Sequence, residues 1–118
     1  MKPSTYSESD YYLTSQLKLG SEQAFTVLFH RYQDKVYQFC LRFTSSSFLA
    51  QEWMQDAFIQ VWLNRSTIDP GKSFSGYLHV IARNKAFDSI KKEASENLRI
   101  GEWVRQAIPA TDYESVYL

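Results

Sequence analysis

Apolar residues recur every three or four positions along most of this 118-residue chain, and this spacing restricts the possible folds more than any other feature. A helix places such residues on one face, whereas a half-buried strand requires apolar and polar residues to alternate. The clearest stretch contains Ala24, Phe25, Leu28, Phe29, Tyr32, Val36, Phe39, Cys40 and Phe43. No segment sustains alternation, and no internal repeat is found. The chain is therefore predicted to be all-α, a compact bundle of about four helices with a less regular C-terminal tail.

Glycine, proline and serine residues set the expected helix boundaries. Gly20 is suited to the left-handed conformation that ends a helix, and Ser21 can cap the helix that follows. The Asp-Pro-Gly sequence at residues 69–71 predicts a loop, after which Ser73 can cap the last long helix. The expected helices cover residues 11–19, 21–43, 49–63 and 73–96.

The composition is typical of one folded domain. Apolar residues make up 44% of the chain, and the formal net charge is zero, whereas disorder requires low hydrophobicity and high net charge. Any basic surface must therefore be local. The single Cys40 leaves no internal disulfide and fits a reducing compartment. Because the start lacks the apolar core of a signal peptide and no later run could span a bilayer, we expect a cytoplasmic location.

The helix expected at residues 49–63 separates into two faces. The arc expected in the core carries Leu49, Trp53, Met54, Ala57, Phe58 and Val61. The opposite arc carries Gln51, Glu52, Gln55, Asp56, Ile59 and Gln60, with Trp62 at its edge. An ordinary solvated face is the simpler interpretation of that arc. A protein-binding surface is the alternative, because the helix has no Lys and carries Ile59 and Trp62, and interfaces favour aromatic residues over Lys.

The helix expected from Ser73 onward also carries two stripes. The stripe expected in the core contains Phe74, Tyr77, Leu78, Ile81, Ala82 and Lys85. The second contains Val80, Asn84, Phe87 and Lys91, with Arg83 beside it. Asn84 could be a buried structural residue, and the lysine pair at residues 91–92 could simply offset the helix dipole. Cations next to rings also suit a single nucleic-acid strand, with charges for phosphates and rings for bases.

Four motifs occur in a fixed order over roughly residues 10–95. They are Gly20-Ser-Glu-Gln-Ala24-Phe25-x-x-Leu28-Phe29-x-x-Tyr32, Gln55-Asp56-Ala57-Phe58-Ile59 with Trp62, Phe74-x-x-Tyr77-Leu78-x-x-Ile81-Ala82-Arg83-Asn84, and Asp88-x-x-Lys91-Lys92. Together they resemble the second conserved region of extracytoplasmic-function RNA polymerase sigma factors. The resemblance implies a helical bundle that docks on the clamp helices of the polymerase β′ subunit and captures the non-template strand of the promoter minus-ten element. It also implies an anti-sigma factor as a partner, which can hold such a chain at the inner membrane.

The resemblance assigns roles to two sets of residues. The set that binds core polymerase is Gln51, Glu52, Gln55, Asp56, Ile59 and Gln60. The set that binds DNA is Arg65, Ser66, Thr67, Ile68, Lys72, Tyr77, Arg83, Asn84, Phe87, Lys91 and Lys92. Within it, the loop at residues 65–73 is expected to hold a flipped-out base in a small pocket. Asn84 is expected to read the strand, and Tyr77 to lie near the point of strand separation.

Three positions depart from the family pattern. Asp56 replaces the commoner Glu and keeps the charge. Val80 stands where relatives often have Arg, so one phosphate contact is either absent or supplied by Arg83. Ile68 stands where some relatives present an aromatic pocket wall, which leaves the preferred base open.

The chain is expected to stop before a second domain of the family. Residues 97–118 are less periodic, although Trp103, Val104, Ala107 and Ile108 could form one more short helix. The predicted boundaries are 1–96 for the helical domain and 97–118 for the start of a linker toward an absent helix-turn-helix domain.

Two other classes of protein stay open from the sequence. One is a helical protein–protein interaction module, or adaptor, whose basic residues are only solvated. The other, less favoured, is an enzyme: His30 and His79 are isolated, and Cys40 lies among phenylalanines, where a structural thiol is expected. No catalytic residue, cofactor, metal site or small-molecule substrate is predicted.

Overall fold

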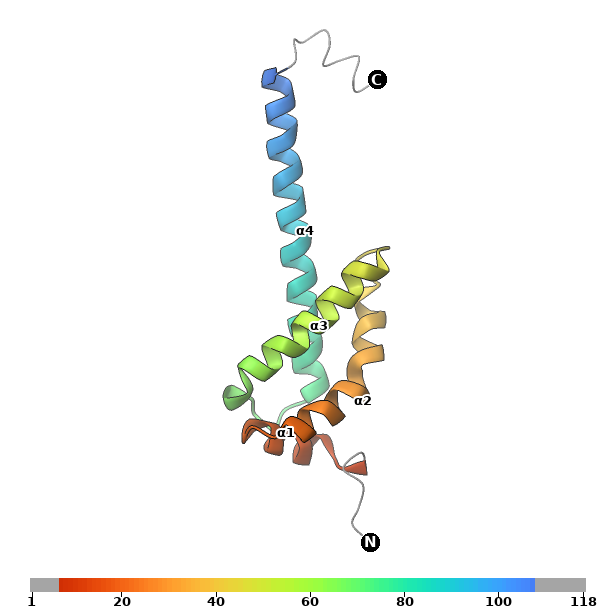
Figure 1. Ribbon diagram of the computed structural model, residues 1–118, viewed down its shortest axis with the longest axis vertical. Helices are drawn as coiled ribbons and strands as arrows, with labels where there is room; N and C mark the ends of the chain where they lie inside the picture. Colours follow the sequence, from red (N-terminus) through yellow and green to blue (C-terminus); the bar gives the residue numbers. More distant parts are fainter. Residues whose placement is uncertain (1–6, 108–118) are drawn as a thin grey trace. The chain divides into compact units, whose positions relative to one another are not determined.

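Residues 7–107 are described by the computed structural model, and within this range the chain is all-α, as predicted. The helices are α1 (Asp10–Lys18), α2 (Glu22–Cys40), α3 (Ser47–Leu63), the short 3-10 helix η2 (Arg65–Thr67) and α4 (Phe74–Ala107) (Figure 1). The chain divides into one unit that ends at Ala86 and a second that begins at Phe87. The first unit holds α1, α2, α3, η2 and the start of α4.

The turn between α1 and α2 follows from two adjacent residues. Gly20 adopts a φ of 95°, which a side chain would strain, and its N–H donates to Leu17 O over 2.8 Å. The N–H of Ser21 donates to Gln16 O over 3.0 Å, so the last carbonyls of α1 are satisfied. The Ser21 hydroxyl then accepts from the Ala24 N–H over 3.1 Å and starts α2. The predicted boundary is confirmed at both residues.

The C-terminal end of α2 differs from the prediction, because the helix stops at Cys40 rather than near Phe43. The apolar spacing continues to Phe43, whose ring centroid lies 5.3 Å from that of Phe39. The backbone changes nevertheless, since the N–H groups of Arg42 and Phe43 donate to carbonyls only three residues back. The Ser46 hydroxyl then accepts from the Leu49 N–H over 3.1 Å and caps α3.

The start of α4 is as expected, and its end is not. The Ser73 hydroxyl accepts from the Gly76 N–H over 3.0 Å and caps the helix. The prediction that the helix frays past Glu96, with a separate short helix near Trp103, is wrong, because α4 continues to Ala107. Residues 97–107 contain no proline and several good helix formers, so the backbone continues even where the apolar spacing fades. Ile108 lies outside the described residues, and the predicted boundary at residue 96 stays a prediction.

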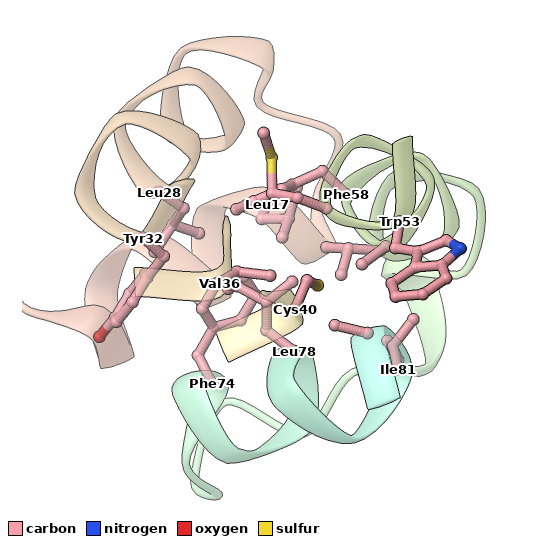
Figure 2. Close-up of a cluster of buried hydrophobic side chains, with 14 of the residues drawn as sticks. Leu17, Leu28, Tyr32, Val36, Cys40, Trp53, Phe58, Phe74, Leu78 and Ile81 are labelled. Carbon is pink, nitrogen blue, oxygen red and sulfur yellow. The ribbon is translucent and has the colours of Figure 1, made fainter. Parts of the chain in front are cut away.

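The core of the first unit is built from all four α-helices. Figure 2 shows Leu17 of α1, Val36 and Cys40 of α2, Phe58 of α3 and Leu78 of α4 pointing toward one another. Each of these side chains is at most 2% exposed. Burial of one such aliphatic or aromatic side chain stabilises a fold by about 1.5–3 kcal/mol. This core fixes which face of α3 and of α4 remains available to a partner.

The second unit is the remainder of α4, from Phe87 onward. Several of its large apolar side chains are exposed: Phe87, Ile90, Leu98, Ile100 and Trp103. Among the described residues of this unit, none belongs to the buried core.

Candidate functional site

The two predicted faces of α3 are present in the structure. Trp53, Met54, Ala57, Phe58 and Val61 are buried, and Leu49 is partly buried against them. On the opposite face, the side chains expected to bind polymerase reach the surface. Gln51, Glu52, Gln55 and Ile59 are exposed, and Asp56 and Gln60 are partly buried. Ile59 is 55% exposed, so this polar face carries an apolar side chain that the fold leaves uncovered.

A groove of about 450 Å³ runs beside this polar face. Three of the predicted polymerase-binding residues line it: Asp56, Ile59 and Gln60. Leu63, Asn64 and Lys85 complete the lining, and the sequence had not assigned these three to the site. Lys85 had been expected on the core stripe of its helix; it is partly buried and lines the same groove as Asp56. The groove thus combines an acidic group, a basic group and two aliphatic side chains.

A smaller pocket of about 220 Å³ opens where η2 leads into α4. Its lining includes four of the predicted DNA-binding residues: Thr67, Ile68, Lys72 and Tyr77. Asp69 and Ser73 also line it and belong to the loop expected to form the pocket, although neither was assigned individually; Phe74 lies outside that prediction. The Asp-Pro-Gly turn was the available signal for Asp69, whose carboxylate accepts from the Gly71 N–H over 2.9 Å and orders the loop.

The chemistry of this pocket is mixed. Ile68 and Phe74 are only 4% and 3% exposed, so two apolar side chains form part of its lining. Tyr77 adds a partly exposed ring, and Lys72 adds an exposed ammonium. The volume is below the roughly 300–1,000 Å³ of most small-molecule sites. These apolar side chains, the Tyr77 ring and the single cation suit a ligand that has one planar ring with polar edges and an attached phosphate.

Two predicted DNA-binding residues of η2 lie elsewhere. Arg65 and Ser66 line a separate concavity of about 250 Å³, together with Lys18, Leu19, Gly20 and Leu63. The guanidinium of Arg65 lies 4.1 Å from the ring centroid of Trp62, and its Nη1 donates to Trp62 O over 2.8 Å. Arg65 is therefore held away from the pocket that contains Tyr77.

The predicted DNA-binding residues of α4 fall into both units. Arg83 and Asn84 are exposed in the first unit, beyond Tyr77 along the helix. Exposure rules out the buried structural role considered for Asn84. Val80, which replaces a frequent Arg, is 46% exposed on the same helix. Phe87, Lys91 and Lys92 are exposed in the second unit.

The shifted ionisable groups lie in the core and at its edge. Burial, followed by the hydrogen bond to Asp10, raises the pKa of Tyr32 to about 12. Burial raises the pKa of the Cys40 thiol to about 11, so little of the nucleophilic thiolate exists at neutral pH. This supports the structural role expected for Cys40. Within residues 7–107, no cluster of His, Cys, Asp and Glu side chains could hold a metal ion.

No helix among residues 7–107 is long and apolar enough to cross a membrane.

The chain is similar in sequence to known proteins. The family model for Sigma-70 region 2 matches residues 28–96. The ECF RNA polymerase sigma factor SigW of Bacillus subtilis (strain 168) is 36% identical over 78 residues, which are 66% of this chain and 42% of SigW. The RNA polymerase sigma factor CarQ of Myxococcus xanthus is 32% identical over 74 residues, or 63% of this chain and 42% of CarQ. The chain thus spans less than half the length of these relatives.

A solved structure gives the same relationship in three dimensions. It is the NMR structure of the complex formed by an engineered region 2 of sigmaE with GTAAAA. The two folds superpose with a TM-score of 0.70 at 28% sequence identity, over 75% of this chain and 93% of the other.

Proposed function

The chain belongs to the Sigma-70 region 2 family, and on this basis we propose that it binds core RNA polymerase and recognises and melts the promoter minus-ten element. It acts by recognition and has no catalytic step of its own. The observation that carries the proposal is the pocket lined by Ile68, Lys72 and Tyr77, in a fold shared with a region 2 that forms a complex with GTAAAA.

The pocket can hold one base taken out of the stack. Flipping a base costs a few kcal/mol, which a shaped pocket and hydrogen bonds to the base edge can offset. Ile68 and Phe74 supply apolar contacts for the faces of the base, and the Thr67 hydroxyl and Asp69 carboxylate are polar partners for its edge. Lys72 is positioned for the phosphate.

The remaining DNA contacts come from α4. Tyr77 lies at the pocket, where a ring can stack on the last base pair as the strands part. Asn84 is exposed and offers an amide that can donate to and accept from one base edge. Arg83, Lys91 and Lys92 contribute charge for phosphates, and Phe87 contributes a ring.

Core polymerase binds a different set of residues, the polar face of α3. Gln51, Glu52 and Gln55 offer exposed hydrogen-bonding groups, and Ile59 offers an apolar contact. The adjoining groove with Asp56 and Lys85 gives the surface charges of both signs. Charge complementarity at such a surface sets partner choice and association rate. An anti-sigma factor that covers this face would block the polymerase, and such a partner would decide where in the cell the chain is held.

A selection experiment tests the proposal. Core polymerase, with or without the chain, is mixed with single-stranded DNA that carries six randomised positions, the length of GTAAAA. The captured strands are then sequenced. We expect one motif to be enriched only when the chain is present. Capture of the chain by polymerase without enrichment of any motif would favour the adaptor alternative, and failure of polymerase to capture the chain would contradict both functions.

A further inference from the structure

The concavity that contains Arg65 and Ser66 joins segments far apart in the sequence. Lys18, Leu19 and Gly20 come from the end of α1, and Leu63, Arg65 and Ser66 come from the end of α3 and from η2. Figure 1 shows the end of α3 reaching α1, and α1 contacts η2 directly. The volume of about 250 Å³ is close to that of the base pocket, but its lining is mostly polar.

The Arg65 side chain is positioned before any ligand arrives. Its guanidinium lies over the Trp62 ring at 4.1 Å and donates to Trp62 O over 2.8 Å. That bond uses one of five N–H donors. A Cβ added at Gly20 would lie 4.0 Å from Nε of Arg65, at ordinary van der Waals distance, so Gly20 lies beside the guanidinium. A preorganised cation loses less conformational entropy on binding an anion.

The helix dipole explains only part of this arrangement. Lys18 lies in the last turn of α1, where a cation is favourable. The carbonyls that end α1 already accept from the N–H groups of Gly20 and Ser21. The dipole does not account for a second cation, Arg65, brought in from η2. It also does not account for Leu19 and Leu63, which are 82% and 70% exposed at the same site.

Two cations and a hydroxyl beside two exposed leucines match the chemistry of a nucleotide. We propose that this concavity binds one further nucleotide of the same DNA strand, with its phosphate at Lys18, Arg65 and Ser66 and its base against Leu19 and Leu63. The proposal rests on the proposed function, since it extends the strand that occupies the base pocket.

The direction of the strand follows from the order of the sites. The strands part at Tyr77, and the flipped base enters the pocket at Thr67 and Ile68, so the single strand is expected to run from Tyr77 toward η2. Ser66, the next residue along η2, belongs to the second concavity. The non-template strand is single-stranded downstream of its point of separation, toward its 3′ end. The additional nucleotide is therefore on the 3′ side of the flipped base.

The test compares strands that differ only at the 3′ end. The probes are the hexamer enriched by the selection, the same hexamer with a 3′ phosphate, and the hexamer lengthened by one 3′ nucleotide. Each is fluorescein-labelled and titrated with the full chain bound to core polymerase. We expect the added nucleotide to raise affinity severalfold, through its phosphate at the two cations and its base against the two leucines. The 3′ phosphate alone should steepen the slope of log K against log salt by about 0.7, with a smaller gain in affinity.

Three variants locate the effect. Lys18→Gln and Arg65→Gln should remove the gain from the added nucleotide, and Lys18→Gln should leave hexamer binding unchanged. Because Arg65→Gln also loses the contact with Trp62, Lys18→Gln is decisive if that variant folds poorly. Lys35→Gln removes an exposed lysine of α2 outside the concavity and should keep the whole gain.

Several results would overturn the site. An enriched hexamer that gains nothing from the 3′ nucleotide removes this site and leaves the proposed function intact. Equal losses in Lys18→Gln and Lys35→Gln would show only general electrostatic attraction. Weaker capture by core polymerase in Lys18→Gln, with the 3′ gain preserved, would assign the concavity to an acidic group of the polymerase. If the selection enriches no motif, the proposed function fails and this site fails with it.

Discussion

Nη1 of Arg31 donates to Oδ1 of Asp10 over 2.7 Å, which joins the first residue of α1 to the middle of α2. Nη2 of the same guanidinium donates to Glu8 O over 2.8 Å. The hydroxyl of Tyr32 donates to the other carboxylate oxygen of Asp10. One carboxylate therefore fixes α1, and with it Leu13 and Leu17 of the core, against α2.

Removing that carboxylate should loosen α1. Asp10→Ala is expected to lower the free energy of unfolding by about 1 kcal/mol, below the usual contribution of charged hydrogen bonds because the Asp10 and Arg31 side chains are partly exposed. Urea unfolding followed by circular dichroism measures the change. Asp34→Ala is the matched control, since Asp34 is an exposed acid on α2. Equal unfolding midpoints for the two variants would contradict the proposed anchoring.

Alkaline pH should destabilise the chain, because the folded state holds the protons of Cys40 and Tyr32. The folded-state pKa of Cys40 is raised to about 11 and that of Tyr32 to about 12, so the folded state holds both protons more tightly than the unfolded state. The two groups contribute fully to the free energy of unfolding below their unfolded-state pKa values. This contribution is lost as pH rises through their folded-state pKa values. Urea midpoints should therefore fall between about pH 9, where the unfolded Cys40 thiol titrates, and about pH 12, the folded-state pKa of Tyr32. Cys40→Ala should show a shallower fall; an unchanged fall would contradict the role of the thiol.

Charge reversal on the polar face of α3 should separate polymerase binding from folding. Asp56→Arg is expected to abolish capture of the chain by core polymerase, because a reversed charge against a complementary surface costs several kcal/mol. Its melting temperature should change little, as the side chain lies at the surface edge of the groove. Asp34→Arg makes the same reversal elsewhere on the surface and should bind normally. Normal capture of the Asp56→Arg variant would refute the assignment of this face.

A substitution at Asn84 should change the sequence preference of strand binding, whereas a substitution at Lys91 should change its salt dependence. Asn84→Ala is expected to weaken strand binding by about 1–3 kcal/mol and to relax preference at one position of the enriched motif. Lys91→Ala should weaken all sequences alike and reduce the salt slope by about 0.7. Asn97→Ala, on the same helix, serves as the control. Unchanged sequence preference in Asn84→Ala would contradict the base-reading role of Asn84.

Much of this architecture could be predicted from local signals. Gly20, Ser21 and Ser73 act through their own backbone and hydroxyl groups, so their roles could be predicted before any tertiary contact was known. The end of α2 was missed because the apolar spacing reaches Phe43 while the backbone hydrogen bonds change after Cys40. The end of α4 could not be predicted because the apolar periodicity weakens beyond Glu96 while the backbone stays helical to Ala107.

The composition of the sites was less predictable. The two faces of α3 follow from the apolar periodicity within one helix, so its polar face could be predicted from the sequence. Lys85 in the groove and Phe74 in the base pocket depend on how α3, η2 and α4 pack. Lys18 and Arg65 meet only because α1 contacts η2. Such contacts between distant segments leave no mark in local spacing.

Backbone amide chemical shifts of the isotope-labelled chain, recorded with and without the enriched hexamer, test most directly whether the pocket after η2 takes a promoter base. We expect the largest shifts at Thr67, Lys72 and Tyr77 and at Asn84, with Gln51 and Gln55 of the polymerase face unaffected. A hexamer of the same composition in permuted order should leave Thr67 and Tyr77 nearly unshifted. Equal shifts with both strands, or shifts that avoid the pocket, would contradict base recognition there.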